Sequence, residues 1–199
     1  MTRRMRGGAT AFVGVVALLT LALRARASVS IAVLFDELVQ RARAVAVVTP
    51  VEQSGVVEDG RIVTYTRVHV DRLVAGSMGA DVWLRALGGA VGRIGQIVQG
   101  QPTFELGQPA LVFARPGPNG AAQTHPDAWS VVEAAQGEYS VVKGSGQEPR
   151  LATAKDVGGL VAPNRPSVEG RFARDVLVDR SVEEAAREIQ GAWTRLHPR

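Results

Sequence analysis

The stretch that decides the fold is RIVTYTRVHVDRL, residues 61–73. Every second residue here points to the same side of an extended chain, and one such set is mostly β-branched: Ile62, Thr64, Thr66, Val68 and Val70. A period of two sustained over this length predicts a β-strand with one buried face. The preceding Glu58-Asp59-Gly60 predicts a tight turn, because glycine readily adopts positive φ.

Short apolar stretches recur before and after this strand, and no helical pattern lies between them. Their positions are 45–48, 82–87, 110–114, 129–133 and 139–143, and the last two stretches flank Gly137 as in a hairpin. About seven short strands with such spacing predict a small closed antiparallel barrel.

Amphipathic helices are predicted at the two ends of this β region. Residues 31–42 place Leu34, Phe35 and Leu38 on one stripe. Ser181 and Glu184 have the spacing of a capping box, which predicts a helix over 181–199. Residues 144–180 are weakly patterned and rich in Gly and Pro, so we expect a linker or meandering tail there. The predicted division is therefore a leader at 1–27, a barrel domain at 28–143, this tail, and the last helix.

The leader has the form of a secretory signal peptide. An arginine-rich start precedes an apolar run from Ala9 to Leu23 and an Ala25-Arg26-Ala27 exit. The run is shorter than the roughly 20 residues that a membrane-spanning helix needs. We expect cleavage near Ala27, a mature chain that begins at Ser28, and a secreted or periplasmic location. An uncleaved leader that anchors the chain to the membrane is the alternative.

Cleavage changes the charge of the protein. The five leader arginines (3, 4, 6, 24 and 26) account for the basic excess, because 23 basic residues less these five leaves 18, against 19 acidic ones. Nucleic-acid binding needs a concentrated basic surface, so we expect no nucleic-acid partner. The chain has no cysteine, which excludes disulfides, thiolate metal sites and a cysteine nucleophile.

Motifs that would carry chemistry are missing from the sequence. It contains no His-Glu-x-x-His, no phosphate loop and no Gly-x-Ser-x-Gly elbow, so we expect a non-enzymatic protein without metal or cofactor. His69 and Asp71 share a face of the predicted strand, and with Arg67 they are interpreted as a solvated surface. Tyr65 and Trp83 are placed on the face opposite the core, where they would cover a helix.

The order of elements resembles the netrin-like, tissue-inhibitor-of-metalloproteinase-like branch of the OB-fold. The residues that carry the resemblance are LVQRA at 38–42, VAVV at 45–48, YTRVHVDRL at 65–73, FELGQ at 104–108 and LVF at 111–113. It implies a mainly β fold with an OB-like barrel, an N-terminal helix and a C-terminal amphipathic helix. In the animal inhibitors of this family an N-terminal cysteine binds the zinc of a protease. Here Ser28 would stand in its place, so that mechanism does not carry over.

The resemblance implies that one rim of the barrel is the contact surface. It would combine the new N-terminus, Ser28-Val29-Ser30, with the glycine-rich loop of Gly89, Gly92 and Gly95. We expect an exported binding module for another exported protein, possibly a protease. Two alternatives remain open: an exported hydrolase that assembles His69, Asp71 and a serine, and an envelope or coat component that assembles through an exposed C-terminal helix.

Overall fold

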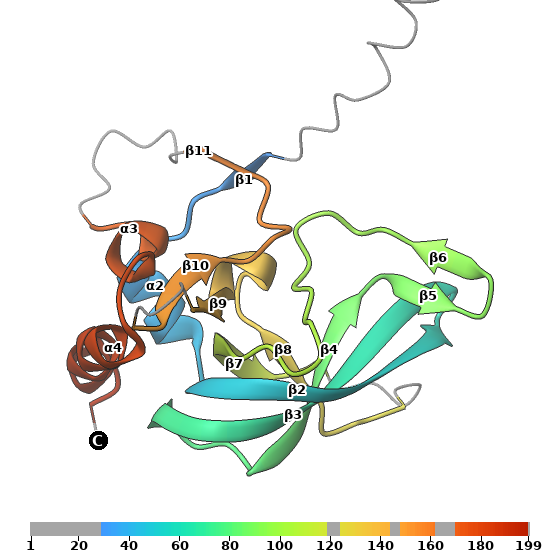
Figure 1. Ribbon diagram of the computed structural model, residues 1–199, viewed down its shortest axis with the longest axis horizontal. Helices are drawn as coiled ribbons and strands as arrows, with labels where there is room; N and C mark the ends of the chain where they lie inside the picture. Colours follow the sequence, from blue (N-terminus) through green and yellow to red (C-terminus); the bar gives the residue numbers. More distant parts are fainter. Residues whose placement is uncertain (1–28, 119–123, 144–147, 162–169, 199) are drawn as a thin grey trace, which may run out of the picture.

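The computed structural model describes residues 29–118, 124–143, 148–161 and 170–198 (Figure 1). Strands are the main regular structure in this part of the chain, and helices lie near its two ends. In chain order the elements are β1 (Val29–Ile31), α2 (Phe35–Arg41), β2 (Ala44–Glu58), β3 (Arg61–Gly76), β4 (Asp81–Leu87), β5 (Gly89–Val91), β6 (Ile94–Gln96), β7 (Ala110–Pro116), β8 (Trp129–Val131), the 3-10 helix η2 (Ala134–Gly137), β9 (Glu138–Val142), β10 (Arg150–Thr153), β11 (Gly159–Val161), α3 (Ala173–Leu177) and α4 (Val182–Leu196).

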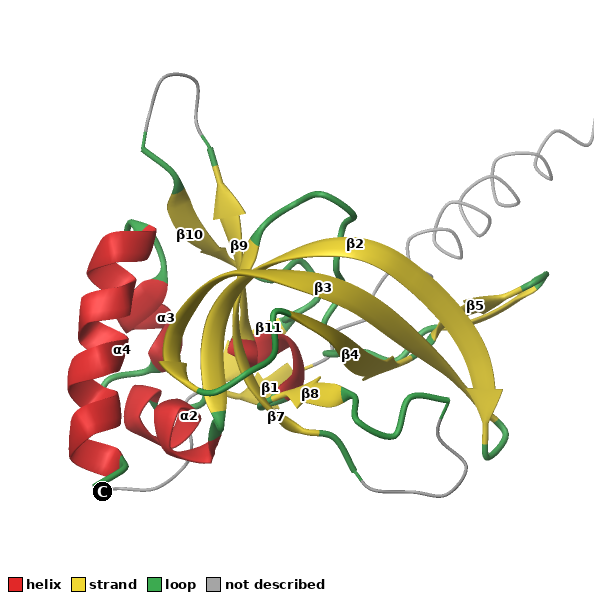
Figure 2. Cartoon of the chain, turned by 90° about the horizontal axis from the view of Figure 1, so that it is seen from below, coloured by secondary structure: helices red, strands yellow, loops and turns green. Residues whose placement is uncertain are grey.

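A long antiparallel hairpin of β2 and β3 forms the frame of the fold (Figure 2). Asp59 and Gly60 connect the two strands with φ angles of 48° and 74°. Two successive left-handed residues match the right-handed twist of a hairpin, which is why the turn needs an Asp-Gly sequence. The strand predicted at residues 61–73 is confirmed, and it continues to Gly76.

Five strands close a barrel in the order β7, β2, β3, β4 and β8, and β8 pairs back onto β7. The predicted OB-like barrel with an N-terminal and a C-terminal helix is therefore confirmed. One detail differs: β4 and β8 are parallel, with Leu84 opposite Trp129. The predicted hairpin of the last two strands is wrong, because β8 and β9 both pair along the same edge of β7.

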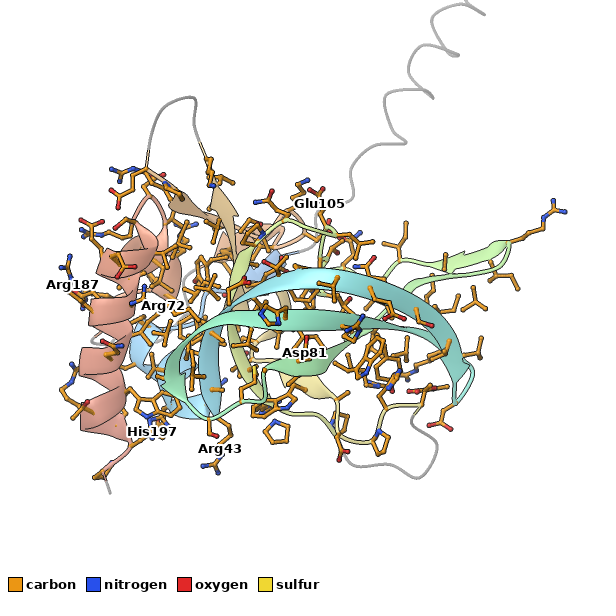
Figure 3. All side chains as sticks on the ribbon, turned by 60° about the horizontal axis from the view of Figure 1, so that its bottom comes forward. Arg43, Arg72, Asp81, Glu105, Arg187 and His197 are labelled. Carbon is orange, nitrogen blue, oxygen red and sulfur yellow. The ribbon has the colours of Figure 1, made fainter. Side chains whose placement is uncertain are left out.

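The helices cover one end of this barrel (Figure 1). Helix α2 is shorter than the predicted 31–42, since Ile31 belongs to β1. Helix α4 begins with the predicted capping box, in which the Ser181 hydroxyl accepts from the Glu184 N–H. The face of α4 that packs on the core is at most 1% exposed and consists of Ala185, Ala186, Ile189 and Ala192. Arg72 of β3 also reaches α4, where it binds the Glu183 carboxylate (Figure 3). This helix face is thus covered within the protein, which disfavours the coat-component alternative.

The described parts of residues 144–180, namely 148–161 and 170–180, contribute to this core, although their pattern led us to expect a linker or meandering tail. Leu151 of β10 and Leu177 of α3 are both 0% exposed. β10 extends the sheet beyond β9, and β11 pairs in parallel with β1. The N-terminal strand is therefore held beside the barrel by a segment far from it in sequence.

Candidate functional site

A projecting hairpin and a long connection lie on the side of the barrel away from α3 and α4 (Figure 1). The β5–β6 hairpin projects there, and the connection from β6 to β7, residues 97–109, runs back toward β1 (Figure 1). Gly100 of this connection approaches the Ser30 hydroxyl of β1, since a Cβ built on Gly100 would lie 4.0 Å from that oxygen. We call the surface formed by β1, the β5–β6 hairpin and residues 97–104 the rim surface.

Two hollows open on the rim surface, with volumes of about 440 Å³ and about 630 Å³. The first lies between the base of the β5–β6 hairpin and residues 97–104, and the second lies between those residues and β1. Four residues line both hollows: Leu87, Gln99, Gln101 and Pro102. Both volumes fall in the range of about 300–1,000 Å³ that is typical of ligand sites.

The first hollow has a mixed polar and apolar lining that is nearly uncharged. Its polar lining consists of amide and hydroxyl side chains, namely Gln53, Gln96, Gln99, Gln101, Thr64, Thr66 and Thr103. Asp156 is the single charged residue among those that line it. Such groups both donate and accept hydrogen bonds without requiring a charged partner.

Hydrogen bonds to the barrel hold three of these amides in place. The Ile62 N–H donates to Gln96 Oε1 at 2.7 Å, and the Leu87 N–H donates to Gln101 Oε1 at 3.2 Å. Gln53 donates from Nε2 to the Phe104 carbonyl at 2.7 Å. Each amide therefore has one end bonded, and among the described residues its other end has no hydrogen-bond partner, which leaves that end for a ligand.

The second hollow is bordered by β1 and by a strained turn. Glu133 and Ala134 both have φ near 53°, which is unfavourable for residues with a Cβ. The Glu133 carboxylate accepts from Arg41 at 2.5 Å, which supports the turn from the side of α2. The turn leads into η2, whose Gln136 accepts from the Val33 N–H and donates to the Ile31 carbonyl, both at 2.9 Å. These bonds fix the C-terminal end of β1 next to the hollow.

Large apolar side chains stand exposed beside both hollows. Ile31 lines the second hollow and is 65% exposed, and Ile97 lines the first and is 78% exposed. Ile94, in β6 of the neighbouring hairpin, is 70% exposed. Burial of such side chains is worth about 1.5–3 kcal/mol each, so a surface that leaves several of them open is a contact surface in many proteins.

The predicted site residues divide between these features. Ser30 lines the second hollow and Gly89 lines the first. Val29 pairs with Gly159 at the start of β1. Gly92 forms the tip of the β5–β6 hairpin with φ 58°, and Gly95 pairs with Ala90 in it. Ser28 lies outside the described residues.

Gly89 has a structural reason to be glycine. Its φ is 113°, and a Cβ there would lie 2.0 Å from the Thr64 hydroxyl oxygen. The same hydroxyl donates to the Gly88 carbonyl at 2.7 Å. The glycine-rich loop therefore packs directly on β3 at the edge of the first hollow. The lining glutamines were missed from the sequence, because neutral amides in a loop form no recognisable spacing.

Beneath the rim surface lies a buried carboxyl group, that of Glu138. This side chain is 3% exposed and accepts from the Thr103 N–H at 3.2 Å. Burial, helped by the negative charge of Asp156, raises the pKa of Glu138 to about 7, although the hydrogen bond from Thr103 acts to lower it. Thr103 also donates from its hydroxyl to Asp156 at 2.6 Å. Residues 97–104 are thus attached to two carboxyl groups at their C-terminal end.

A second buried carboxyl group, that of Glu58, lies at the far end of the β2–β3 hairpin. It accepts from the Tyr65 hydroxyl at 2.7 Å, from the Thr124 N–H at 2.9 Å and from Arg85 at 3.1 Å. Burial alone would raise the pKa of Glu58, but these hydrogen bonds and the Arg85 charge outweigh it and the pKa lies below its ordinary value. This cluster is fully paired and stabilises the hairpin end.

The placement of Tyr65 and Trp83 under a helix is wrong. Tyr65 is 0% exposed, and the ring of His125 covers both aromatics, stacked on Trp83 at 4.0 Å and edge-on to Tyr65 at 4.7 Å. His125 lies in the connection between β7 and β8, whose polar sequence gave no sign of this contact.

The pair on which the hydrolase alternative rests does not form. His69 Nδ1 lies 3.3 Å from Asp81 Oδ1, whereas Asp71 accepts from the Thr49 hydroxyl at 2.7 Å. The His69 and Asp81 side chains are each 53% exposed, and Asp81 at the start of β4 is the register partner of His69 in β3. His69 lines neither hollow of the rim surface.

Within the described ranges, no group of three His, Asp or Glu side chains is arranged to hold a metal ion. None of the helices in that part of the chain has the length and apolar character to cross a membrane. Comparison with protein-family models, with curated proteins and with solved structures finds no match to this chain.

Proposed function

We propose that this protein is an exported, non-catalytic binding module that recognises another exported protein through the rim surface. The observation that carries the proposal is the pair of adjoining hollows bordered by exposed Ile31 and Ile97. Apolar side chains that stand open beside a concave polar surface are typical of a protein-binding site. The export in this proposal is supported by the leader, which has the pattern of a secretory signal peptide.

A protease is the first class of partner to test. Proteases are the partners of the family that the sequence resembles. The position of β1 supports this choice, because cleavage near Ala27 would place the new N-terminus one residue before β1. Ser30 and Ile31 of β1 line the second hollow. The fixed backbone of β1 favours binding, since a segment that is already ordered loses little conformational entropy in a complex.

The experiment is quantitative capture from native cells. The mature form, with its start defined by N-terminal sequencing, is immobilised and exposed to the culture supernatant and the envelope extract. An Ile31→Asp, Ile97→Asp double variant is compared with Leu73→Asp, which alters an apolar residue that is 43% exposed on β3 and lines neither hollow. We expect an exported protein that is bound by the wild type and by Leu73→Asp and at least about tenfold more weakly by the double variant.

Two results would contradict the proposal. One is a double variant that captures the same exported protein as strongly as Leu73→Asp does. The other is an N-terminal sequence from the native cells that begins before the leader ends, together with recovery in the membrane fraction only. The second result would make the protein an anchored envelope component.

A further inference from the structure

We propose that the first hollow holds the main chain of an extended peptide segment of the partner. This inference rests on the proposed function and specifies which part of the partner enters the rim surface. It is carried by the juxtaposition of Gln53, Gln96 and Gln101 around one hollow, each with one end of its amide already bonded to the protein.

The bonded ends determine what the free ends offer. Gln96 and Gln101 use their oxygens to accept from backbone N–H groups of the barrel, so their Nε2–H groups remain as donors. Gln53 uses its nitrogen as a donor, so its Oε1 remains as an acceptor. Donors and an acceptor on one surface match an extended peptide, which presents C=O and N–H groups in alternation.

Charge favours a peptide over an anionic ligand. Arg and Lys are missing from the lining of the first hollow, and its one charged residue is Asp156. A phosphate-bearing or polyanionic ligand would gain no ion pair here and would be repelled by the carboxylate.

The aromatic content disfavours an oligosaccharide. Phe104 is the one aromatic residue that lines this hollow, and it is 7% exposed. It offers no open ring face on which a sugar could stack. Ile97, by contrast, stands at the hollow with 78% of its surface exposed and provides an apolar contact for a side chain of the peptide.

Recognition through the main chain predicts tolerance of peptide sequence. The hydrogen-bonding groups that the amides would contact are the same in every residue except proline. The side chains of the peptide would be selected mainly where they meet Ile97. The rim surface would then combine a sequence-tolerant hollow with a more specific contact at Ile31.

The test uses defined peptides and the mature protein. Twelve-residue random peptides displayed on phage are selected on the immobilised protein, and the best is synthesised and measured by fluorescence anisotropy. Gln96→Glu and Gln101→Glu keep the oxygen that accepts the backbone N–H but remove the NH2 donor. Gln40→Glu, at an exposed position on α2, is the matched control.

We expect each hollow variant to weaken peptide binding about fivefold to tenfold, and Gln40→Glu to leave it unchanged. Replacement of single peptide amides by esters should weaken binding to a similar degree at two or more positions. In NMR spectra the side-chain NH2 signals of Gln96 and Gln101 should shift with the peptide and not with chitotetraose or maltotetraose.

Three outcomes would overturn this inference: selection of no peptide, binding that is insensitive to both hollow variants, or shifts of the two NH2 signals with an oligosaccharide alone. Its failure is distinguishable from that of the proposed function. Capture of an exported protein that depends on Ile31 and Ile97 but not on Gln96 or Gln101 would remove this inference and leave the proposed function standing.

Discussion

Two buried glutamates, one in β2 and the other in β9, show how differently one residue type behaves. Glu58 is 6% exposed and Glu138 is 3% exposed. The pKa of Glu58 nevertheless lies below its ordinary value, while burial raises the pKa of Glu138 to about 7. The difference lies in their partners, since Glu58 has three donors that include Arg85 and Glu138 has one backbone N–H and a nearby carboxylate.

The two carboxyl groups therefore have different effects on the stability of the fold. An ionised group with donors on all sides makes the β2–β3 hairpin end rigid. An ionised group with one donor costs free energy, so Glu138 favours its neutral form at the base of residues 97–104. The Glu58 carboxylate is therefore electrostatically complete, and the Glu138 carboxylate is not.

The largest expected effect comes from breaking the Glu58 cluster. Glu58→Leu removes the acceptor of three hydrogen bonds and leaves Arg85, whose side chain is 17% exposed, without its counter-charge. We expect a loss of about 3–4 kcal/mol in the free energy of unfolding at pH 7, measured by urea denaturation. Glu105→Leu is the control, because the Glu105–Lys155 pair is exposed on both sides and contributes about 0–1 kcal/mol. Equal losses in the two variants would show that the Glu58 cluster contributes nothing beyond a surface ion pair.

Unlike Glu58→Leu, Glu138→Gln is expected to raise the free energy of unfolding, and the size of the increase depends on pH. The pKa of Glu138 in the folded state, about 7, exceeds its ordinary value of 4.5, so the folded state binds more protons between these two pH values. Stability therefore falls as pH rises from about 4.5 to about 7 and is flat above that. The neutral glutamine avoids this loss.

We expect Glu138→Gln to match the wild type near pH 4.5 and to exceed its free energy of unfolding by up to about 3 kcal/mol at pH 8.5. Urea denaturation at the two pH values measures the difference. Glu105→Gln should show no such dependence, since its side chain is 58% exposed. A Glu138→Gln variant that is less stable than the wild type at pH 8.5 would mean that the buried carboxylate is stabilising.

The smallest of these effects is expected for Tyr65→Phe, which removes one donor of Glu58 and leaves the other two. A charge-assisted hydrogen bond is worth about 1.5–3 kcal/mol, so we expect a loss of about 2 kcal/mol at pH 7. Because the lowered pKa of Glu58 stabilises the fold above about pH 4.5 and this contribution disappears at lower pH, the loss should shrink as the solution is acidified. Chemical denaturation at pH 7 and pH 3.5 checks this, and an undiminished loss at pH 3.5 would assign the effect to packing.

Much of the frame was predictable because local patterns dictate it. The alternation at residues 61–73 and the Asp59-Gly60 turn fix the β2–β3 hairpin, and the Ser181 to Glu184 spacing fixes the start of α4. Export and the choice of partner stay predictions. Ser30 and Gly89 were placed in the candidate surface from the sequence, and each lines a hollow.

The rest was decided by contacts between residues far apart in the chain. Leu151 and Leu177 carry no periodic pattern, yet both are fully buried, since the open end of the barrel needs apolar cover. Tyr65 alternates as an outward residue, yet it packs with Val63 and Ala128 and is covered by the ring of His125.

The β2–β3 hairpin with its turn and the capped start of α4 follow from the sequence, because they depend on backbone preferences and on periodic apolar side chains within a few residues. The tertiary structure alone decided that β8 and β9 share one edge of β7, and that Gln53, Gln96 and Gln101 surround one hollow. The physical reason is that an amide side chain or a short strand has no preferred partner nearby in the chain. Its place is set by which distant backbone groups need a hydrogen bond when the barrel closes.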